Sequence, residues 1–243
     1  MPRFFVSKPV IDIFEITGED ASHITKSLRM QVNETIVLCC NNIDYICKIV
    51  EFTGNSVLVK LISTKQCDAE PKIRVTLFQG IPKSDKMDLI IQKAVEVGVS
   101  EIVPVIMNRC VSRPDKKSLD KKIQRWQKIS LEAAKQSGRG MIPSISNAMN
   151  FNDAVNYAKN NNLILTFYEG GGIPISRAID SNAESAAIFI GPEGGFDISE
   201  IDLIKQFNAT ICSLGNRILR TETAAIVAPA LVIYEHERNA TAQ

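Results

Sequence analysis

The stretch that decides the fold is Ile190-Gly191-Pro192-Glu193-Gly194-Gly195-Phe196, which continues an apolar run, 187–190. An apolar run that ends in a glycine-rich loop, with Asp197 and Ser199 as possible helix caps, is typical of a strand–loop–helix step. Three glycines around a proline and a carboxylate let the main chain turn sharply and approach a ligand closely. Taken alone, the loop is either a ligand site or a plain tight turn.

A second unusual loop opens the last expected helix: Leu214-Gly215-Asn216-Arg217-Ile218-Leu219-Arg220-Thr221-Glu222-Thr223-Ala224-Ala225. Its two arginines lie three residues apart beside a helix start, an arrangement that favours binding of an anion. The alternative is structural, with the arginines pairing with Glu193 or Glu222 and only holding the two loops together.

Strand and helix patterns alternate from Pro71 onward, which is typical of a parallel sheet covered on both faces by helices. The expected strands are 74–80, 101–107, 163–168, 187–190 and 210–213. The expected helices are one between Ser84 or Asp85 and Gly98, and then 118–137, 151–160, 199–207 and 221–237. Because ligands of such sheets bind outside the carboxyl ends of strands, both unusual loops are placed for function.

The first 70 residues have a different pattern, with short segments rich in Val, Ile and Phe. The expected strands are 4–6, 11–16, 35–40, 45–50 and 56–62, with one helix over 20–30. This pattern predicts a small β-barrel. We therefore expect an α/β protein of two domains, a barrel over 1–71 and a parallel-sheet domain over 72–243.

Composition excludes several classes of protein. The chain has 243 residues, of which 45% are hydrophobic and 23% charged, as in an average globular protein. No apolar run approaches the roughly 18 residues of a membrane helix, and the N-terminus lacks a secretory signal, so we expect a cytoplasmic protein without membrane association. Six cysteines without C-x-x-C spacing and only two histidines predict neither a metal site nor disulfides.

Charge is unevenly distributed although the net charge is only +1. Residues 72–140 carry 15 Lys and Arg against 7 Asp and Glu, whereas the segments on either side are acidic. A basic segment of this kind suits phosphate-backbone binding. The alternative is a solvated helix face, since six of these cations fall around the expected helix 118–137.

Common nucleotide and hydrolase motifs are missing. The sequence has no G-x-x-x-x-G-K-[ST], no G-x-G-x-x-G after a strand and no G-x-S-x-G. Two glycine-bearing loops, a basic segment and a separate barrel therefore point to a nucleic-acid enzyme with a compact cofactor.

The two loops also carry a resemblance. Residues 191–196 and 214–224 resemble the two signature loops of the bacterial ribosomal RNA methyltransferases that methylate uracil N3 in small-subunit (16S) RNA, within the SPOUT superfamily. The resemblance covers nearly the whole chain. Supporting matches are Arg3-Phe4-Phe5-Val6, the His23…Leu28-Arg29 element, Lys86-Met87-Asp88, 92–99 and 132–139.

The resemblance implies a fold and a set of partners. The N-terminal domain is expected to be an RNA-binding barrel related to PUA domains, and the C-terminal domain to contain a deep trefoil knot. The implied cofactor is S-adenosyl-L-methionine, and the implied partners are small-subunit ribosomal RNA or the assembled small subunit and a second copy of the chain in a homodimer.

Roles for individual residues follow from the loops and the resemblance. Arg220 is the expected stabiliser of charge on the uracil, with Glu222 or Glu193 as candidate base. The expected cofactor-binding residues are Thr166, Gly191, Glu193, Gly194, Leu214, Gly215, Ile218 and Leu219. The expected RNA-binding residues are Arg3, Lys26, Arg29, Arg109, Arg113 and Arg139.

Three other functions remain open from the sequence. A knotted methyltransferase acting elsewhere on RNA, such as a ribose 2′-hydroxyl, would share both loops. A non-catalytic RNA-binding ribosome assembly factor could retain them as a relic. A small-molecule methyltransferase fits poorly with the basic segment and the separate barrel.

Overall fold

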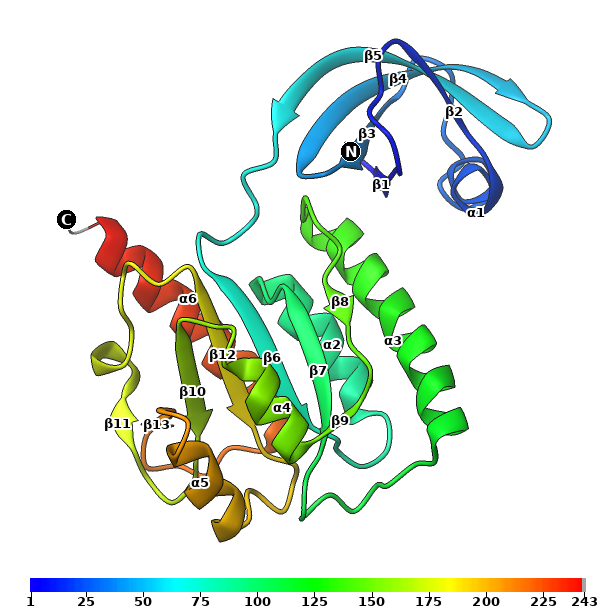
Figure 1. Cartoon of the computed structure of the whole chain (residues 1–243). Coiled ribbons are helices and arrows are strands. Elements are labelled where there is room, and N and C mark those ends of the chain that lie inside the picture. Colours follow the sequence, from blue (N-terminus) through cyan, green and yellow to red (C-terminus); the bar gives the residue numbers. More distant parts are fainter. Residues whose placement is uncertain (242–243) are drawn as a thin grey trace. The chain divides into compact units, whose positions relative to one another are not determined.

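The computed structural model describes residues 1–241 (Figure 1). The chain divides into two compact units. Unit 1 comprises Met1–Glu70 together with Ala134–Met141, and unit 2 comprises Pro71–Ala133 and the chain from Ile142 onward. The expected division at residue 71 places 134–141 in the second domain, whereas these residues pack with unit 1.

Unit 1 is built on one five-stranded sheet in the order β1-β3-β4-β5-β2. Its strands are β1 (Arg3–Phe5), β2 (Ile13–Ile16), β3 (Thr35–Cys40), β4 (Ile43–Thr53) and β5 (Ser56–Gln66). β1 pairs with β3 in parallel, and the other neighbours are antiparallel. The sequence predicted a small β-barrel; within residues 1–241 no pairing joins β1 to β2, so the sheet is open at these two strands.

The helical segment of unit 1 differs from the single helix expected over 20–30. It consists of α1 (Gly18–Ser22) followed by a π-helical turn, η1 (His23–Ser27). The hydroxyl of Thr25 donates to the carbonyl of Ala21 (2.9 Å), a side-chain bond that competes with the regular helical ladder. Arg29 then adopts a left-handed conformation (φ 52°) and the helix does not continue. Ala21 and Ile24 pack into the core of the sheet.

A buried arginine joins the two segments of unit 1. Arg139, only 2% exposed, donates from Nη2 to Glu70 (2.6 Å), and the same carboxylate accepts the backbone N–H of Gly140 (2.9 Å). Burial alone would raise the pKa of Glu70, but the bonds from Arg139 and the backbone lower it. A second pair, Arg3 with Asp44 (2.7 Å), lies on the same unit.

Unit 2 is a layered α/β structure. Its sheet has the order β11-β13-β10-β12-β6-β7-β8, with β9 also on β7, and these strands pair in parallel. The strands are β6 (Arg74–Gly80), β7 (Glu101–Ile106), β8 (Ser144–Ile145), β9 (Met149–Asn150), β10 (Leu163–Phe167), β11 (Ile173–Pro174), β12 (Ser185–Ile190) and β13 (Thr210–Ser213). The helices are α2 (Lys86–Val97), α3 (Lys116–Ser137), α4 (Phe151–Ala158), η2 (Ile175–Arg177), α5 (Ile198–Lys205) and α6 (Thr221–Thr241).

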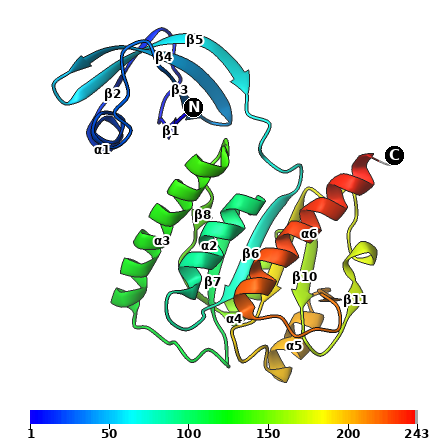
Figure 2. The same cartoon turned by 180° about the vertical axis from the view of Figure 1, so that it is seen from behind.

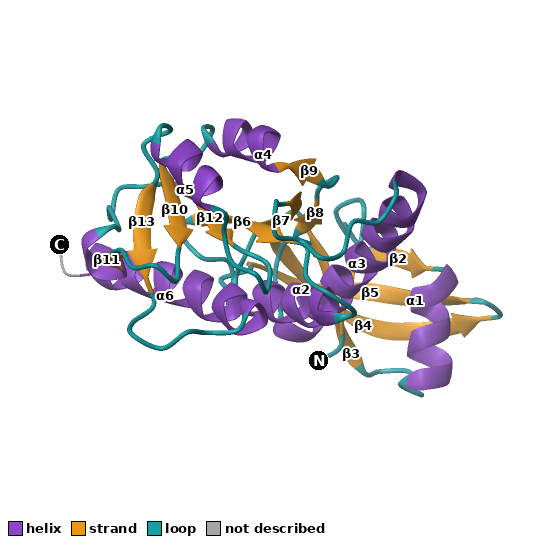
Figure 3. Ribbon diagram, turned by 90° about the horizontal axis from the view of Figure 1, so that it is seen from below, coloured by secondary structure: helices purple, strands orange, loops and turns teal. Residues whose placement is uncertain are grey.

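Helices cover both faces of this sheet, as predicted. α2 and α6 lie on one face, and α4 and α5 lie on the other (Figures 2 and 3). Residues 75–80 of β6 and all of β12 are buried because both faces are covered. Phe78 of β6 stacks on Phe189 of β12 with 4.5 Å between ring centroids. The short elements β8, β9, β11 and η2 were not predicted, since two or three residues carry no periodic signal.

Helix α2 follows its sequence pattern closely. Met87, Ile90 and Ala94 are buried on one face, and the helix ends at Gly98, whose φ of 114° is readily adopted only by glycine. Asp85 occupies the N-cap position, although its side chain makes no capping hydrogen bond.

The order of the strands determines where the two unusual loops lie. β10 lies between β12 and β13 and is parallel to both. Their carboxyl ends therefore meet at one edge of the sheet, and each is followed by a loop that leaves this edge. Segments that are far apart in the sequence are thus brought together.

Three further observations concern membrane spans, cysteines and metal ligands. No helix among the described residues is long and apolar enough to cross a membrane. All six cysteines are free and buried, and burial raises the pKa of Cys39 to about 12, which disfavours its thiolate. Among the described residues, no cluster of His, Cys, Asp or Glu side chains is placed to hold a metal ion.

We expect Arg139→Met to destabilise unit 1 by about 3 kcal/mol, because it leaves the Glu70 carboxylate without its buried partner. Urea denaturation followed by far-UV circular dichroism measures this, since the single tryptophan, Trp126, lies in unit 2. Arg177→Met, at an exposed arginine, is the control and should cost less than about 0.5 kcal/mol. Equal stabilities of the two variants would contradict this role of Arg139.

The same ion pair predicts a pH dependence. Glu70 has a lowered pKa in the folded state, so its contribution to stability is present above its ordinary pKa and disappears as pH falls through the lowered value. This acid-dependent part should shrink in Arg139→Met.

Candidate functional site

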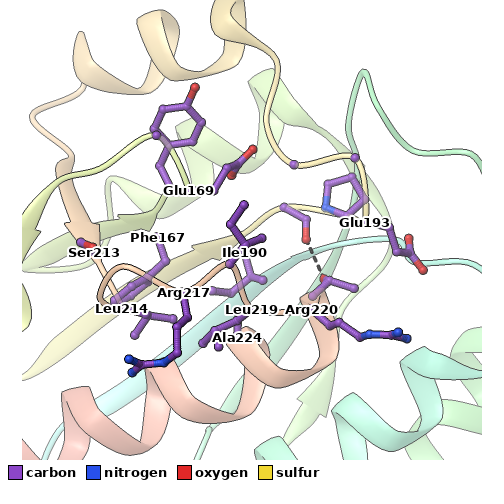
Figure 4. A pocket seen from close by; sticks show the side chains of 18 of the residues that line it. Phe167, Glu169, Ile190, Glu193, Ser213, Leu214, Arg217, Leu219, Arg220 and Ala224 are labelled. Atoms are coloured by element: carbon purple, nitrogen blue, oxygen red, sulfur yellow. Dashed lines mark hydrogen bonds between the residues drawn. The ribbon is translucent and has the colours of Figure 1, made fainter.

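A cavity of about 710 Å³ lies at the carboxyl ends of β10, β12 and β13. Its size falls within the roughly 300–1,000 Å³ of small-molecule sites. Three segments supply most of its wall (Figure 4). The lining residues are Lys86, Phe167, Tyr168, Glu169, Gly170, Gly171, Ile190, Gly191, Pro192, Glu193, Gly194, Gly195, Ser213, Leu214, Gly215, Asn216, Arg217, Ile218, Leu219, Arg220, Thr221 and Ala224. Both loops singled out in the sequence thus line the same cavity.

A buried hydrogen-bond network holds the two loops together. The Thr221 hydroxyl, at the start of α6, donates to the carbonyl of Gly191 (2.7 Å) and accepts from Nε2 of Gln79 (3.0 Å). Gln79 is the penultimate residue of β6, is wholly buried, and also donates to the carbonyl of Gly80 (2.8 Å). This network joins β6, the loop after β12 and the start of α6.

A lysine rather than an arginine pairs with the carboxylates of the two loops. Nζ of Lys86, at the start of α2, lies 3.1 Å from Glu193 and 3.2 Å from Glu222. The backbone N–H of Lys83 also donates to Glu193 (3.1 Å). Pairing of these glutamates with Arg217 or Arg220, one of the alternatives raised by the sequence, is therefore not what the structure shows.

Arg217 and Arg220 therefore remain available to bind a ligand. Within residues 1–241 no hydrogen bond or ion pair holds the guanidinium of Arg217 or Arg220, and both residues are exposed. Arg220 still acts on Glu222 at longer range, since its charge helps to lower the pKa of that carboxyl. The cavity thus presents two unpaired cations on the wall formed by the second loop (Figure 4).

Lys86, Glu193 and Glu222 keep one another ionised. Partial burial alone would raise the pKa of Glu193 and of Glu222, but hydrogen bonds from the backbone and from Lys86 lower both. The same bonds, first to Glu193 and then to Glu222, raise the pKa of Lys86. At neutral pH the cluster is therefore one cation between two anions.

The expected cofactor residues line the cavity with one exception. Gly191, Glu193 and Gly194 from the first loop do so, as do Leu214, Gly215, Ile218 and Leu219 from the second. Thr166 does not line it: its side chain is wholly buried within β10, and its hydroxyl has no hydrogen-bond partner among the described residues. Thr166 lies one residue before the end of β10, so the strand continues for one more residue before the chain reaches the cavity, and its cofactor role stays a prediction.

Sequence reasoning missed part of the wall. The segment 167–171 after β10 and Lys86 at the start of α2 both line the cavity. The expected parallel sheet was the available signal for 167–171. In such a sheet the carboxyl end of the strand that precedes this segment lies at the same edge as the ends of the two strands that carry the loops. Lys86 was noted only within the Lys86-Met87-Asp88 match to the family, and no pattern in the sequence places it at this cavity.

Arg3 and Arg139, two of the expected RNA-binding residues, form ion pairs within unit 1. Arg139 is buried against Glu70, and Arg3 donates to Asp44 and to the carbonyl of Arg139. Phosphate contact at these two positions would require breaking ion pairs that hold the unit together. Their positions therefore argue for a structural role.

The other four expected RNA contacts are exposed on their own units. Lys26 and Arg29 lie in and after η1 of unit 1. Arg109 and Arg113 lie in the loop after β7, where Arg109 donates to the carbonyl of Gly194 (3.2 Å). These four remain predictions.

Comparison with known proteins identifies the class. A family model described as an RNA methyltransferase domain matches residues 69–233, and a second, described as an RNA methyltransferase PUA domain, matches residues 16–62. The chain therefore belongs to the RNA methyltransferases that combine these two domains.

Individual relatives narrow the family. The ribosomal RNA small subunit methyltransferase E of Mesomycoplasma hyopneumoniae is 38% identical over 93% of this chain and 96% of its own length. The protein of the same name from Bacillus subtilis is 32% identical over 98% of each chain. This chain belongs to the ribosomal RNA small subunit methyltransferase E family.

Solved structures agree with this assignment. A ribosomal RNA small subunit methyltransferase E from Neisseria gonorrhoeae, bound to S-adenosyl methionine, has a TM-score of 0.84 at 28% identity and covers 95% of this chain and 96% of its own. A Legionella pneumophila protein solved with the same cofactor has a TM-score of 0.85 at 31% identity, with the same coverage.

We expect Thr221→Val to destabilise unit 2 by about 2 kcal/mol. Valine keeps the shape of threonine but removes the hydroxyl, so the buried Nε2 of Gln79 and the carbonyl of Gly191 each lose this hydrogen bond. Urea denaturation followed by Trp126 fluorescence measures this in unit 2. Thr221→Ser, which retains the hydroxyl, is the matched control. A serine variant as unstable as the valine variant would show that the hydroxyl is not what matters.

Proposed function

We propose that this chain transfers a methyl group from S-adenosyl-L-methionine to N3 of a uracil in small-subunit (16S) ribosomal RNA. The observation that carries the proposal is that the glycine loop after β12 and the arginine loop after β13 line one cavity. The names of the relatives support the RNA substrate, and two solved neighbours contain the cofactor. The N3 position rests on the family resemblance.

The cavity fits the cofactor in size and chemistry. Apolar side chains of Phe167, Ile190, Leu214 and Leu219 line it and suit an adenine ring. Gly215 has a φ of 96°, and because it has no side chain the ring can approach the main chain closely there. S-adenosylmethionine supplies the methyl group as part of a positively charged sulfonium. Gly191 and Gly194, which have no side chains, would let the first loop approach the ribose and methionine parts of the cofactor.

Arg220 is proposed to stabilise the reacting base. Uracil N3 carries a proton and is a poor nucleophile until that proton leaves and negative charge spreads over the ring carbonyls. A fixed cation beside these carbonyls lowers the barrier, because charge develops there in the transition state. Arg220 lines the cavity and no ion pair within residues 1–241 engages it, which suits this role.

Glu222, one of the two candidate bases, fits a structural role better than that of a base. Its carboxylate is held by Lys86 and its pKa is lowered, which makes it a weak proton acceptor. It also does not line the cavity. We assign it to fixing Lys86 at the start of α2. Glu193, the other candidate base, lines the cavity, but its carboxylate is also held by Lys86 and its pKa is also lowered.

RNA binding is proposed to rest on the exposed arginines and lysine. Lys26 and Arg29 on unit 1, and Arg109 and Arg113 on unit 2, are the phosphate contacts we propose. The target base must leave its stack to reach a methyl donor, which favours a distorted or single-stranded site in assembled RNA. A chain acting on ribosomal RNA would work in the cytoplasm.

Two further features are proposed from the resemblance alone. The C-terminal unit is expected to contain a trefoil knot, and the protein to form a homodimer. Light scattering of the purified protein should give a mass twice the 26.8 kDa of one chain. A mass of one chain at micromolar concentration would contradict the dimer.

The activity is tested by methyl transfer from labelled S-adenosylmethionine to small subunits from cells that lack this gene. Mass spectrometry of the digested RNA should locate the methyl group on uracil N3. A methyl group on a ribose 2′-hydroxyl would replace the proposed position with the rival one, and no transfer would favour an assembly factor.

We expect Arg220→Ala to lower kcat by about 100-fold or more, in line with removal of one group that stabilises transition-state charge. Cofactor affinity, measured by calorimetry, should change less than about threefold, because the proposed role concerns the uracil. Arg177→Ala, an exposed arginine outside the cavity, is the control. A large loss of cofactor affinity with unchanged kcat would instead place Arg220 in the cofactor site.

A further inference from the structure

Glu169 is a carboxylate that nothing so far explains. It follows the end of β10 by two residues and lines the cavity. Within residues 1–241 its side chain has no hydrogen bond or ion pair. The other carboxylate of the cavity wall, Glu193, is held by Lys86 and by the backbone of Lys83.

The glycine loop makes room for this side chain. A Cβ atom at Gly195 would lie 2.8 Å from Cδ of Glu169 and closer still to Oε1, so any other residue at 195 would displace the carboxylate. The φ of Gly195 is +69°, which also favours glycine. The last glycine of the loop therefore lets Glu169 lie directly against the main chain of the first loop.

Charge is segregated across the cavity. Glu169 lies on the opposite wall from Arg217 and Arg220, as Figure 4 shows. A ligand that spans this cavity meets an unpaired anion at one wall and unpaired cations at the other. The wall with Glu169 therefore suits the positive part of a ligand, and the other wall suits an electron-rich partner such as the uracil carbonyls.

We propose that Glu169 is the counter-ion for the positive charge of the methyl donor, and that it gives the cavity a preference for the charged sulfonium over the neutral thioether left after transfer. This inference rests on the proposed function. S-adenosylmethionine carries one more positive charge than S-adenosylhomocysteine, and a nearby carboxylate in a partly enclosed site attracts that charge. The preference would help S-adenosylhomocysteine to leave the cavity after transfer and a new S-adenosylmethionine to bind.

The test compares the affinities of both compounds by isothermal titration calorimetry of the full chain. Glu169→Gln keeps the shape and removes the charge. We expect its affinity for S-adenosylmethionine to fall about tenfold, with S-adenosylhomocysteine affected less than about threefold. Raising the salt concentration should reduce the preference of the wild-type protein and change that of the variant little.

Glu184→Gln is the matched control, because Glu184 is exposed, lies outside the cavity and loses the same charge. Circular dichroism confirms that both variants fold. An unchanged ratio of the two dissociation constants in Glu169→Gln overturns the inference while leaving the proposed function intact. Failure of the wild-type protein to bind either compound overturns the proposed function itself.

Discussion

The site depends on the parallel pairing of β10 with both β12 and β13. This pairing brings three strand ends to one edge of the sheet, so that segments 167–171, 190–195 and 213–221 surround one cavity. The hydroxyl of Thr221 then fixes two of these segments to each other through Gly191 and Gln79. Without this pairing, neither loop has a partner with which to form a binding site.

The electrostatics of the cavity follow from which charges are already paired. Lys86 pairs with both Glu193 and Glu222, and neither carboxylate is paired with an arginine of the second loop. Arg220, proposed to face the uracil, and Glu169, proposed to face the donor, are left without ion-pair partners among the described residues. A single lysine at the start of α2 thereby separates the structural charges of the site from those proposed to act in the reaction.

Much of unit 2 was predictable because its signals are local. β6 and β13 have the predicted bounds, and both loops follow strands as expected. In unit 1 the strands β4 and β5 are longer than their apolar runs, because cross-strand hydrogen bonds extend the ladder to polar pairs such as Asp44 with Lys65. Hydropathy does not report such pairing. The open sheet edge and the split helix at residues 18–27 were missed for the same reason, since both depend on backbone hydrogen bonds.

The site itself was predictable only in part. The loop residues were found because glycine and arginine beside a helix start have a direct physical meaning. Arg139 was predicted to bind RNA, but it is buried against Glu70, and no charge pattern distinguishes a buried arginine from an exposed one. Glu169 was missed, and Lys86 was noted only as part of a family match, because their places in the site come from the tertiary contacts with Gly195 and Glu193.

The most direct test of the account is a crystal structure of this chain soaked with S-adenosylmethionine. We predict that the donor lies between the glycine loop at 190–195 and the arginine loop at 213–221, inside the cavity that both line. Density for the donor at another place on the molecule, or the two loops standing apart without a shared cavity, would contradict it.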